Sequence, residues 1–498
     1  MGVTMVAVNQ RLIQSNVSTR TETNTFLRKK PIFVQLNRFM KTYDAIVIGS
    51  GQGGTPLSKK LEELGWKVIL IEKKAIGGTC INEGCTPTKT MIASAKMAYD
   101  ITKADQFGIQ TGATRLDIKK VLLRKNSIVE DFRSSAEKGL KETKDLDIIY
   151  GTASFTGKKE VMVVSAKGRS QKFTADKIFI NAGTRPNIVS IKGLVEVDYL
   201  TSTTIMELPE VPDHLLILGG GYIGLEFGQM YRRFGSKVTI VESNARFLPH
   251  EDDDVAKCIR EFLEKEGIQI MTGAEATAVT KQAGGIAATV KTSSTKKRIA
   301  CSHLLMALGR IPNSDLLNLE AAGLKTDPQG FIKVNGQLET NVKGIYALGD
   351  IKGGPQFTHV SYNDHLLIYK TLTGNKKVNY LDRLVPYTMF TDPQLGRVGI
   401  TEDEARKKKM KIQIATLDMS HVARAIETGD TRGMMKALVN ADNGKILGAA
   451  IIGEQGGEIM TMLQMAMIGG IKWQQIRELP IAHPLYAESL NNLFMKLT

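Results

Sequence analysis

Cysteine, tryptophan and long apolar runs are all scarce in this 498-residue chain. It contains 4 cysteines and 2 tryptophans, and none of its apolar runs reaches the roughly 18 residues that a membrane-spanning helix needs. So few cysteines exclude the disulfide framework of a small secreted protein. The composition, 42% hydrophobic and 23% charged, is that of a globular protein. We therefore expect a cytoplasmic protein with no membrane partner.

Acidic residues are outnumbered by basic ones, and the formal net charge is +15. The excess is dispersed, and no nucleic-acid-binding motif accompanies it, so we interpret it as a solvated basic surface and expect no nucleic-acid partner. Residues 1–40 contain Glu22 as their single acid. This polar segment is either a disordered leader, such as a transit peptide, or an upstream extension of a chain that starts at Met40.

Two of the four cysteines lie close together, in the segment GGTCINEGCTPTK at residues 77–89. A glycine turn precedes Cys80, and a helix can begin at Cys85, where the helix dipole and nearby Lys89 favour a thiolate. The C-x4-C gap differs from the C-x2-C spacing typical of zinc sites, and the sequence offers no second ligand pair, so we expect no metal site. The segment therefore predicts a redox-active dithiol.

A glycine fingerprint occurs twice, each time between an apolar strand and a helix. The first copy is GSGQGG at 49–54 and the second is GGGYIG at 219–224, and a glutamate follows 18 residues after each last glycine. Such glycines let the backbone approach a pyrophosphate, the helix N-terminus stabilises its charge, and the glutamate accepts from ribose hydroxyls. The residues predicted to bind dinucleotides are Gly49, Gly51, Gly54, Glu72, Gly219, Gly221, Gly224 and Glu242.

The surroundings of each fingerprint indicate its cofactor. The first is adjacent to the dithiol and so should hold a flavin, FAD. Asp350, at the end of the apolar strand near 345–348, can accept from the hydroxyls of the ribityl chain. The second should hold the nicotinamide nucleotide. Glu242 would repel a 2′-phosphate and the next arginine is Arg246, so NADH is favoured over NADPH.

A proton acceptor for thiol chemistry is offered near the C-terminus, in AHPLYAE at 482–488. Pro484 fixes the backbone beside His483, and Glu488 can orient the imidazole ring and raise its basicity. Taken alone, this pattern also fits an ordinary surface histidine. The two remaining cysteines, Cys258 and Cys301, are interpreted as small buried hydrophobic residues.

Together these residues resemble the flavin-dependent pyridine nucleotide–disulfide oxidoreductases, which include glutathione reductase, dihydrolipoamide dehydrogenase and mercuric reductase. The likeness extends from about Tyr43 to the C-terminus. Besides the dithiol and both fingerprints, it rests on NAGTRP at 181–186, ALGRIPN at 307–313, Gly-Asp at 349–350 and the His-Pro-x-x-x-Glu ending.

The resemblance implies an α/β homodimer with two Rossmann-like dinucleotide-binding domains and a C-terminal α+β interface domain. We divide the chain into the leader at 1–40, an FAD-binding domain at 41–186, an NAD(P)-binding domain at 187–312, a central domain at 313–379 that completes the FAD site, and an interface domain at 380–498.

The resemblance also implies a role for each site residue. Cys80 would be the thiol that attacks the substrate, and Cys85 the thiol that faces the flavin. His483, with Glu488, would come from the partner subunit as acid and base. The other implied site residues are Lys89 near the flavin and its ion-pair partner Glu226, Tyr222 covering the nicotinamide pocket, and the cofactor-binding residues Gly78, Thr79, Gly183 and Gly309.

Three segments, CTPTKT at 85–90, PQFTHVS at 355–361 and ESLNNLF at 488–494, look like the mercuric-reductase-like branch, which includes flavin reductases of the reactive-chlorine response. The chain has no cysteine after Cys301, so it lacks the C-terminal cysteine pair that transfers mercury to the active site in mercuric reductases. We predict electron transfer from NAD(P)H through FAD and Cys80/Cys85 to a disulfide, metal ion or oxidant. The alternatives are a dihydrolipoamide dehydrogenase of a 2-oxo acid complex and a redox-sensing flavoprotein.

Overall fold

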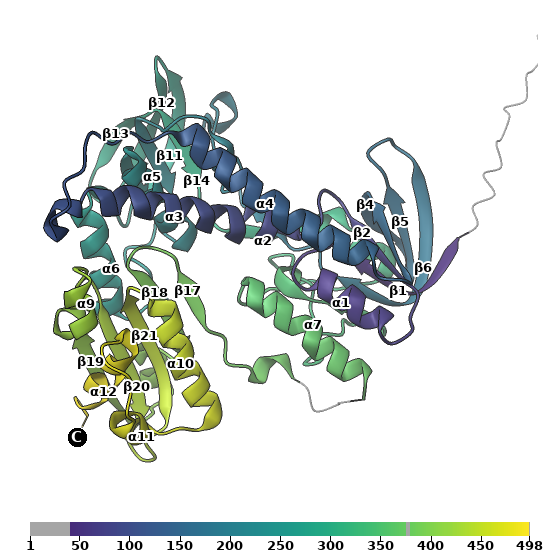
Figure 1. Cartoon of the computed structure of the whole chain (residues 1–498). Coiled ribbons are helices and arrows are strands. Elements are labelled where there is room, and N and C mark those ends of the chain that lie inside the picture. The colour runs from purple at the N-terminus through teal and green to yellow at the C-terminus, as the bar shows by residue number, and fades with distance from the viewer. Residues whose placement is uncertain (1–39, 375–378, 498) are drawn as a thin grey trace, which may run out of the picture. The chain divides into compact units, whose positions relative to one another are not determined.

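The structure is a computed structural model that describes residues 40–374 and 379–497 (Figure 1), and the predicted leader lies outside these residues except for Met40. Within the described ranges, no helix combines the length and apolar character needed to cross a membrane.

The N-terminal sheet is mainly parallel, with the order β3-β2-β1-β6 and with β16 on the other side of the end of β6. An antiparallel hairpin of β4 and β5 pairs with the first half of β6. Residues 45–48 and 68–71 of the central strands are all buried, because helical side chains cover one face of the sheet, while the β4–β5 hairpin and residues 317–332 cover the other. The strands are β1 (Lys41–Ile48), β2 (Val68–Glu72), β3 (Leu146–Tyr150), β4 (Thr152–Gly157), β5 (Glu160–Val164), β6 (Ser170–Ile180) and β16 (Ile345–Ala347).

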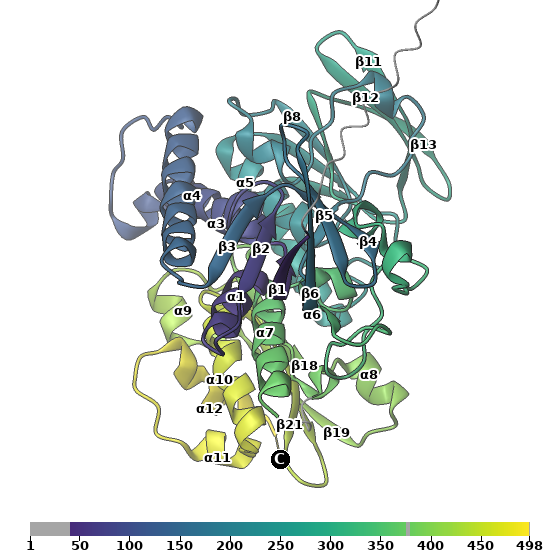
Figure 2. The same ribbon diagram turned by 90° about the vertical axis from the view of Figure 1, so that its right-hand side faces the viewer.

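The helices of this part include α1 (Gly54–Glu62) and α7 (Thr358–Leu372), which pack against each other although nearly 300 residues separate them. A second packed pair is formed by α3 (Cys85–Ile101) and α4 (Ile118–Lys141), which lie side by side in Figures 1 and 2. The short α2 (Gly78–Glu83) connects β2 to α3.

A second parallel sheet, of order β10-β9-β8-β14, carries the second fingerprint. Its strands are β8 (His214–Leu218), β9 (Lys237–Val241), β10 (Ile268–Met271) and β14 (His303–Met306), and its helices are α5 (Tyr222–Phe234) and α6 (Asp253–Lys265). A three-stranded antiparallel sheet follows α6 in the chain, made of β11 (Glu275–Gln282), β12 (Gly285–Lys291) and β13 (Lys296–Cys301).

Two short antiparallel strands connect the two parallel sheets. The chain leaves the first through β7 (Thr184–Pro186) and returns through β15 (Arg310–Pro312). The whole second sheet is therefore an insertion in the first, since β16 pairs with β6 only after this return.

The C-terminal part is a five-stranded antiparallel sheet of order β17-β18-β21-β20-β19, and α10 packs on β18 and β21. Together with the two parallel sheets, it confirms the predicted fold class. The strands are β17 (Tyr387–Met389), β18 (Gln394–Gly399), β19 (Ile412–Asp418), β20 (Met434–Asn440) and β21 (Ile446–Gly453), and the helices are α8 (Glu402–Lys407), α9 (Ala423–Glu427), α10 (Gly456–Gly469), α11 (Trp473–Glu478) and α12 (Ser489–Phe494).

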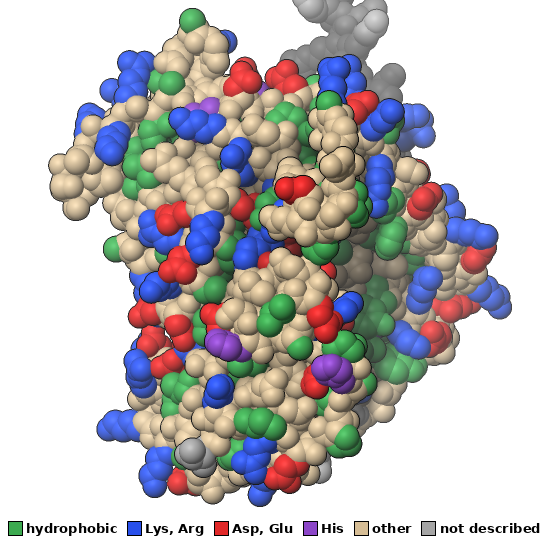
Figure 3. Space-filling model, turned by 60° about the vertical axis from the view of Figure 1, so that its left-hand side comes forward, with side chains coloured by type: hydrophobic (Ala, Val, Ile, Leu, Met, Phe, Trp, Pro, Cys, Tyr) green, Lys and Arg blue, Asp and Glu red, His purple; other side chains and the backbone are tan. Residues whose placement is uncertain are grey.

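Charged side chains are mixed on the face drawn in Figure 3, where Lys and Arg alternate with Asp and Glu. This is the distribution of a solvated surface. Of the two cysteines outside the dithiol, which were both expected to be buried, only one is fully buried. Cys258 is half-buried in α6, and Cys301 is buried in β13.

Candidate active site

The dithiol lies at a sharp junction between two helices. Cys80 is in α2, and Cys85 is the first residue of α3, as predicted. Gly84 between them permits the close approach, because a Cβ there would lie 2.8 Å from the Thr79 carbonyl oxygen. The Cys85 Sγ is 3.3 Å from the Thr358 Oγ1, on the first residue of α7.

The two thiols differ in acidity because they share one hydrogen bond. The pKa of Cys85 is lowered to about 6 by the hydrogen bond from Cys80, by that from Thr358 and by the charge of Lys89, against the opposing effect of burial. The same bond, together with burial, raises the pKa of Cys80. At neutral pH, the reduced pair is therefore a Cys80 thiol that donates to a Cys85 thiolate, at a helix N-terminus that favours the charge.

An ion pair lies one helical turn beyond the thiolate. The Lys89 Nζ is 2.8 Å from the Glu226 Oε2 and 4.6 Å from the centre of the Phe390 ring. The other Glu226 oxygen accepts from the Phe390 backbone N–H at 2.8 Å. The pair thus joins α3 of the first sheet, α5 of the second and the segment after β17.

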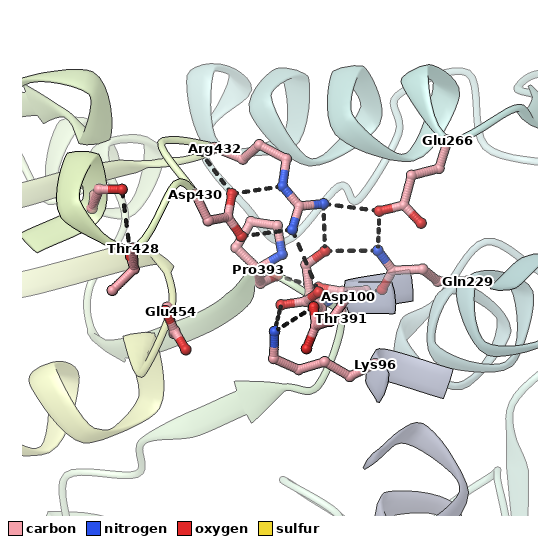
Figure 4. Close-up of polar contacts among 12 residues, drawn as sticks. Lys96, Asp100, Gln229, Glu266, Thr391, Pro393, Thr428, Asp430, Arg432 and Glu454 are labelled. Carbon is pink, nitrogen blue, oxygen red and sulfur yellow. Dashed lines mark hydrogen bonds and ion pairs between the residues drawn. The ribbon is translucent and has the colours of Figure 1, made fainter. Parts of the chain in front are cut away.

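The same three parts meet again at Asp392, and Figure 4 shows Lys96, Gln229 and Arg432 converging near Thr391 and Pro393. The Gln229 amide of α5 exchanges two hydrogen bonds with the Asp392 backbone, at 2.7 and 2.8 Å. Arg432 donates to the Asp392 carbonyl at 3.1 Å and to Glu266 at 2.9 Å, and Lys96 of α3 is 3.9 Å from the Asp392 carboxylate. This network fixes the helix that carries the thiolate relative to α5 and to the C-terminal sheet.

Close backbone contacts explain the glycines of the first fingerprint. At Gly49, where φ is +100°, a Cβ would lie 2.3 Å from the Asn181 carbonyl oxygen, and at Gly54 it would lie 1.9 Å from the Gly49 oxygen. A Cβ on Gly51 would lie 3.1 Å from the Asn181 Oδ1, which accepts from the Gly54 N–H at 2.9 Å. A cradle of this kind fits a pyrophosphate against the N-terminus of α1.

Glu72 lies at the end of β2, beside this cradle. Its Oε2 accepts from the Ser50 N–H at 2.9 Å and from the Ser50 hydroxyl at 2.5 Å, and its Oε1 accepts from the Lys74 N–H at 2.8 Å. Gly78 approaches the same turn, since its Cβ would lie 2.6 Å from the Gly51 Cα, and the adjacent Thr79 is exposed. Glu83, between the cysteines, pairs with the Lys74 Nζ at 2.9 Å.

Asp350 is half-buried where β16 ends, and burial raises its pKa. It accepts from the Thr184 hydroxyl at 3.1 Å, and this hydroxyl in turn accepts from the Arg310 Nε at 2.8 Å. A carboxylate with so much remaining acceptor capacity fits the hydroxyls of a ribityl chain. Gly183 and Gly309, both with positive φ, adjoin Thr184 and Arg310.

The second fingerprint repeats the cradle. A Cβ on Gly219 would lie 2.3 Å from the Ala307 carbonyl oxygen, and one on Gly224 would lie 2.1 Å from the Gly219 oxygen. The Cβ of a residue at 221, in contrast, would enter open space. This opening at the N-terminus of α5 fits the pyrophosphate of a second dinucleotide.

Glu242 is fixed at the end of β9. Its Oε2 accepts from the Gly220 N–H at 2.7 Å, while its Oε1 accepts from the backbone and side-chain nitrogens of Asn244 at 2.8 and 2.7 Å. Arg246 is engaged by carboxylates, at 2.8 Å from both Asp253 and Asp403. The end of β9 thus presents the Glu242 carboxylate, and Arg246, the next arginine along the chain, is already paired with two acids.

His483 lies in the C-terminal part, between α11 and α12. Its Nδ1 is 2.9 Å from the Glu488 Oε2, and because a carboxylate can only accept, Nδ1 donates and Nε2 is left as the basic atom. The imidazole is 67% exposed. Within residues 40–374 and 379–497 of one chain, the imidazole forms hydrogen bonds to the Glu488 carboxylate and none to the thiol of Cys80 or Cys85.

Sequence reasoning missed several residues that shape the site. Asn181, Thr184, Arg310 and Thr358 all lie in segments whose likeness to the family was noticed, although no role was assigned to them. A signal for the Asp392 network was also present, since Glu226, Gln229 and Arg233 recur at the spacing of one helical face.

The fold and the dithiol together define a flavoprotein disulfide reductase. The family model for pyridine nucleotide-disulphide oxidoreductases matches residues 43–364, and that for the dimerisation domain of this family matches residues 385–494. The chain belongs to this family, whose members use flavin and pyridine nucleotides.

Several relatives align with nearly the whole chain. RclA of Escherichia coli (strain K12), named a probable pyridine nucleotide-disulfide oxidoreductase, is 36% identical over 459 residues, which is 91% of this chain and 99% of the relative. The mercuric reductase of Lysinibacillus sphaericus is 33% identical over 90% of this chain and 81% of its own length, and the dihydrolipoyl dehydrogenase of Thermus scotoductus is 33% identical over 91% and 96%. A solved Cu(II) complex of RclA, described as an HOCl-induced flavoprotein disulfide reductase, covers 92% of this chain and 100% of its own at 35% identity, with a TM-score of 0.84.

Proposed function

We propose that this oxidoreductase transfers two electrons from NADH, through bound FAD, to the Cys80–Cys85 pair and then to a small oxidised acceptor. The observation that carries the proposal is the setting of the pair, because Cys85 begins α3 with its Sγ 3.3 Å from the Thr358 Oγ1, in surroundings that lower its pKa while the pKa of Cys80 is raised. A buried structural pair would need no such difference.

The acidity of the two thiols fits the reductive step. A bound flavin supplies the two-electron relay between the nicotinamide and the sulfur atoms. The hydride of NADH amounts to two electrons and one proton, so the S–S bond breaks, Cys80 receives the proton and Cys85 is left as the thiolate. Thr358, at 3.3 Å from the Cys85 Sγ, and the charge of Lys89 stabilise this thiolate.

Glu242 and Arg246 support NADH as the reductant. The Glu242 carboxylate is held by three hydrogen bonds from Gly220 and Asn244, so it would repel a 2′-phosphate and accept from a 2′-hydroxyl. Arg246 is paired with two acids and is not free to bind a phosphate. A reductant of this kind is also the basis for placing the enzyme in the cytoplasm.

A homodimer would bring a proton acceptor to the substrate side of the dithiol. The dimerisation-domain match and the exposed apolar side chains of α10, Met462, Met465 and Ile468, support the pairing of two copies. His483 of the second subunit would then take the proton of Cys80 through Nε2 as Cys80 attacks the acceptor, with Glu488 holding the ring.

The acceptor class is suggested by the relatives. RclA is described as HOCl-induced and was solved as a Cu(II) complex, and other relatives are mercuric reductases. We propose that the acceptor is a metal ion or a small inorganic oxidant. Lipoamide is the second candidate, because dihydrolipoyl dehydrogenases are 33% identical to the chain.

Anaerobic reduction of the purified flavoprotein by NADH, followed by turnover with lipoamide, Cu(II) or hypochlorous acid, tests this function. We expect Cys80→Ser to keep FAD but to lose dithiol-dependent turnover, whereas Cys258→Ser, at the half-buried cysteine of α6, should keep both. Fast lipoamide turnover would favour the dehydrogenase alternative. Reduction by NADH without turnover of any acceptor would favour a redox sensor.

A further inference from the structure

Tyr222, the first residue of α5, is held by a carboxylate that it shares with a second tyrosine. Its hydroxyl donates to the Glu251 Oε1 at 2.9 Å, and the hydroxyl of Tyr387 donates to the same oxygen at 2.6 Å. Glu251 lies just before α6 and is 1% exposed. Tyr387 belongs to β17, so the second sheet and the C-terminal sheet hold this ring jointly.

The rings of the two tyrosines are also stacked. Their centres are 5.4 Å apart with an interplanar angle of 29°, and Tyr387 stacks in turn on Phe357 at 5.6 Å and 13°. Phe357 immediately precedes Thr358, the residue that contacts the Cys85 sulfur. The position of Tyr222 is therefore fixed through its ring as well as its hydroxyl.

Arg397 places a guanidinium group beside Glu251, on the side away from the tyrosines. It lies directly opposite Tyr387 across the β17–β18 pair, and its Nε is 3.8 Å from the Glu251 Oε2. That oxygen and both terminal nitrogens of Arg397 are buried without a hydrogen-bond partner among the described residues. The two tyrosine hydroxyls are therefore the hydrogen-bond donors to this carboxylate, and both donate to its Oε1.

We propose that Glu251 and Tyr387 form a latch that holds Tyr222 closed over the nicotinamide site. This inference rests on the proposed function and on the covering role that the family resemblance implies for Tyr222, which follows the open space at Gly221. A nicotinamide ring can enter only when the Tyr222 side chain swings away, which breaks its hydrogen bond to Glu251. Glu251 and Tyr387 are thus positioning residues that set how readily the cover opens.

The latch should weaken nucleotide binding without slowing the transfer that follows. When the binding-competent state is a minor population, the apparent Kd rises in inverse proportion to that population. Loss of one net hydrogen bond that favours the closed state should lower the Kd about fivefold, as expected for a contribution of about 1 kcal/mol. The limiting rate of flavin reduction should stay the same, because the open state is unaltered.

Calorimetric titration of the oxidised holoenzyme with NAD⁺ measures this Kd without turnover. Glu251→Leu, which removes the acceptor of the Tyr222 hydroxyl, and Tyr222→Phe should each lower it about fivefold, and the double variant should lower it no further, because both changes remove one interaction. Tyr231→Phe is the matched control, since this tyrosine is also in α5 but donates to the Ile205 carbonyl oxygen at 2.6 Å. Its Kd should equal that of the unsubstituted protein.

Stopped-flow reduction by NADH completes the test. We expect Glu251→Leu to keep the limiting rate while reaching half of it at a lower NADH concentration. An unchanged Kd in both single variants, or effects that add in the double variant, would overturn the latch and leave the proposed function standing. If Glu251→Leu does not fold, Tyr222→Phe against Tyr231→Phe decides the matter. If neither NADH nor NADPH reduces the flavin of the unsubstituted protein, the proposed function and the latch are both refuted.

Discussion

The hydrogen bond between Thr358 and Cys85 gives a direct measure of how the protein keeps one thiol ionised. Replacing Thr358 by Val preserves the shape of the side chain but removes the Oγ1 that lies 3.3 Å from the sulfur. The thiolate then loses one of the contacts that lower its pKa to about 6, while the bond from Cys80 and the charge of Lys89 remain. Thr358→Val should therefore raise the pKa of Cys85.

The size of this rise follows from the chemistry of the contact. A hydrogen bond to a charged group contributes about 1.5 kcal/mol or more, and one pKa unit corresponds to about 1.4 kcal/mol. We therefore expect the Cys85 midpoint to move from about 6 to about 7. At pH 6.5, the thiolate would then be the minor form in the variant and the major form in the parent.

A Cys80→Ser background makes the assay specific, because it leaves one thiol at the site and a serine hydroxyl that can still donate to it. The other two thiols stay protonated below pH 9, since burial raises the pKa of Cys258 and of Cys301 to about 11. Alkylation of the holoenzyme by iodoacetamide, followed from pH 4 to pH 9, thus reports Cys85. The rate should fall as the pH falls through the midpoint, because the thiolate is the nucleophile.

Thr371→Val is the control for this prediction. Thr371 lies on the same helix, α7, and its hydroxyl donates to the Leu367 carbonyl oxygen at 2.9 Å. Its midpoint should match that of the background. An unaltered midpoint in Thr358→Val, or one that moves to lower pH, would show that Thr358 does not stabilise the thiolate.

Two further predictions concern the ends of the electron path. His483→Ala should slow reduction of a disulfide acceptor about a hundredfold, within the range of general acid–base catalysis, while NADH still reduces the flavin at its normal rate. Equal slowing of both half-reactions would argue against the role of His483. The control is His421→Ala, at an exposed histidine just after β19. Glu242→Arg should move the ratio of kcat/KM values about tenfold towards NADPH, because it replaces the anion held by Asn244. A steady-state comparison of the two nucleotides that shows an unchanged ratio would place the ribose elsewhere.

Local patterns predicted much of this molecule because the features they describe are local. The fingerprints at 49–54 and 219–224 require a strand, a tight turn and a helix within thirty residues, and all three are present in both copies. The helix start at Cys85 was also predicted from short-range features of the sequence. The domain limits and the roles of the site residues stay predictions.

Contacts between distant segments were beyond the reach of such patterns. Thr358 reaches Cys85 across 273 residues and Asp392 meets Gln229 across 163 residues, so spacing along the chain could not pair them. No sequence pattern indicated a role for Glu251, because a glutamate in a polar stretch resembles any surface acid. The structure reveals its role, since the hydroxyls of Tyr222 and Tyr387 both donate to it.

The two short strands β7 and β15 have a consequence for the order in which the protein is made. The chain enters and leaves the second parallel sheet through these two strands. The first parallel sheet therefore stays incomplete until β16, at 345–347, has been synthesised and pairs with β6. The inserted segment, residues 187–309, is synthesised before β16 and contains its own core. During synthesis it can therefore fold before the first parallel sheet is complete. The predicted flavin site, which includes Asp350, is completed only after the inserted segment has been made.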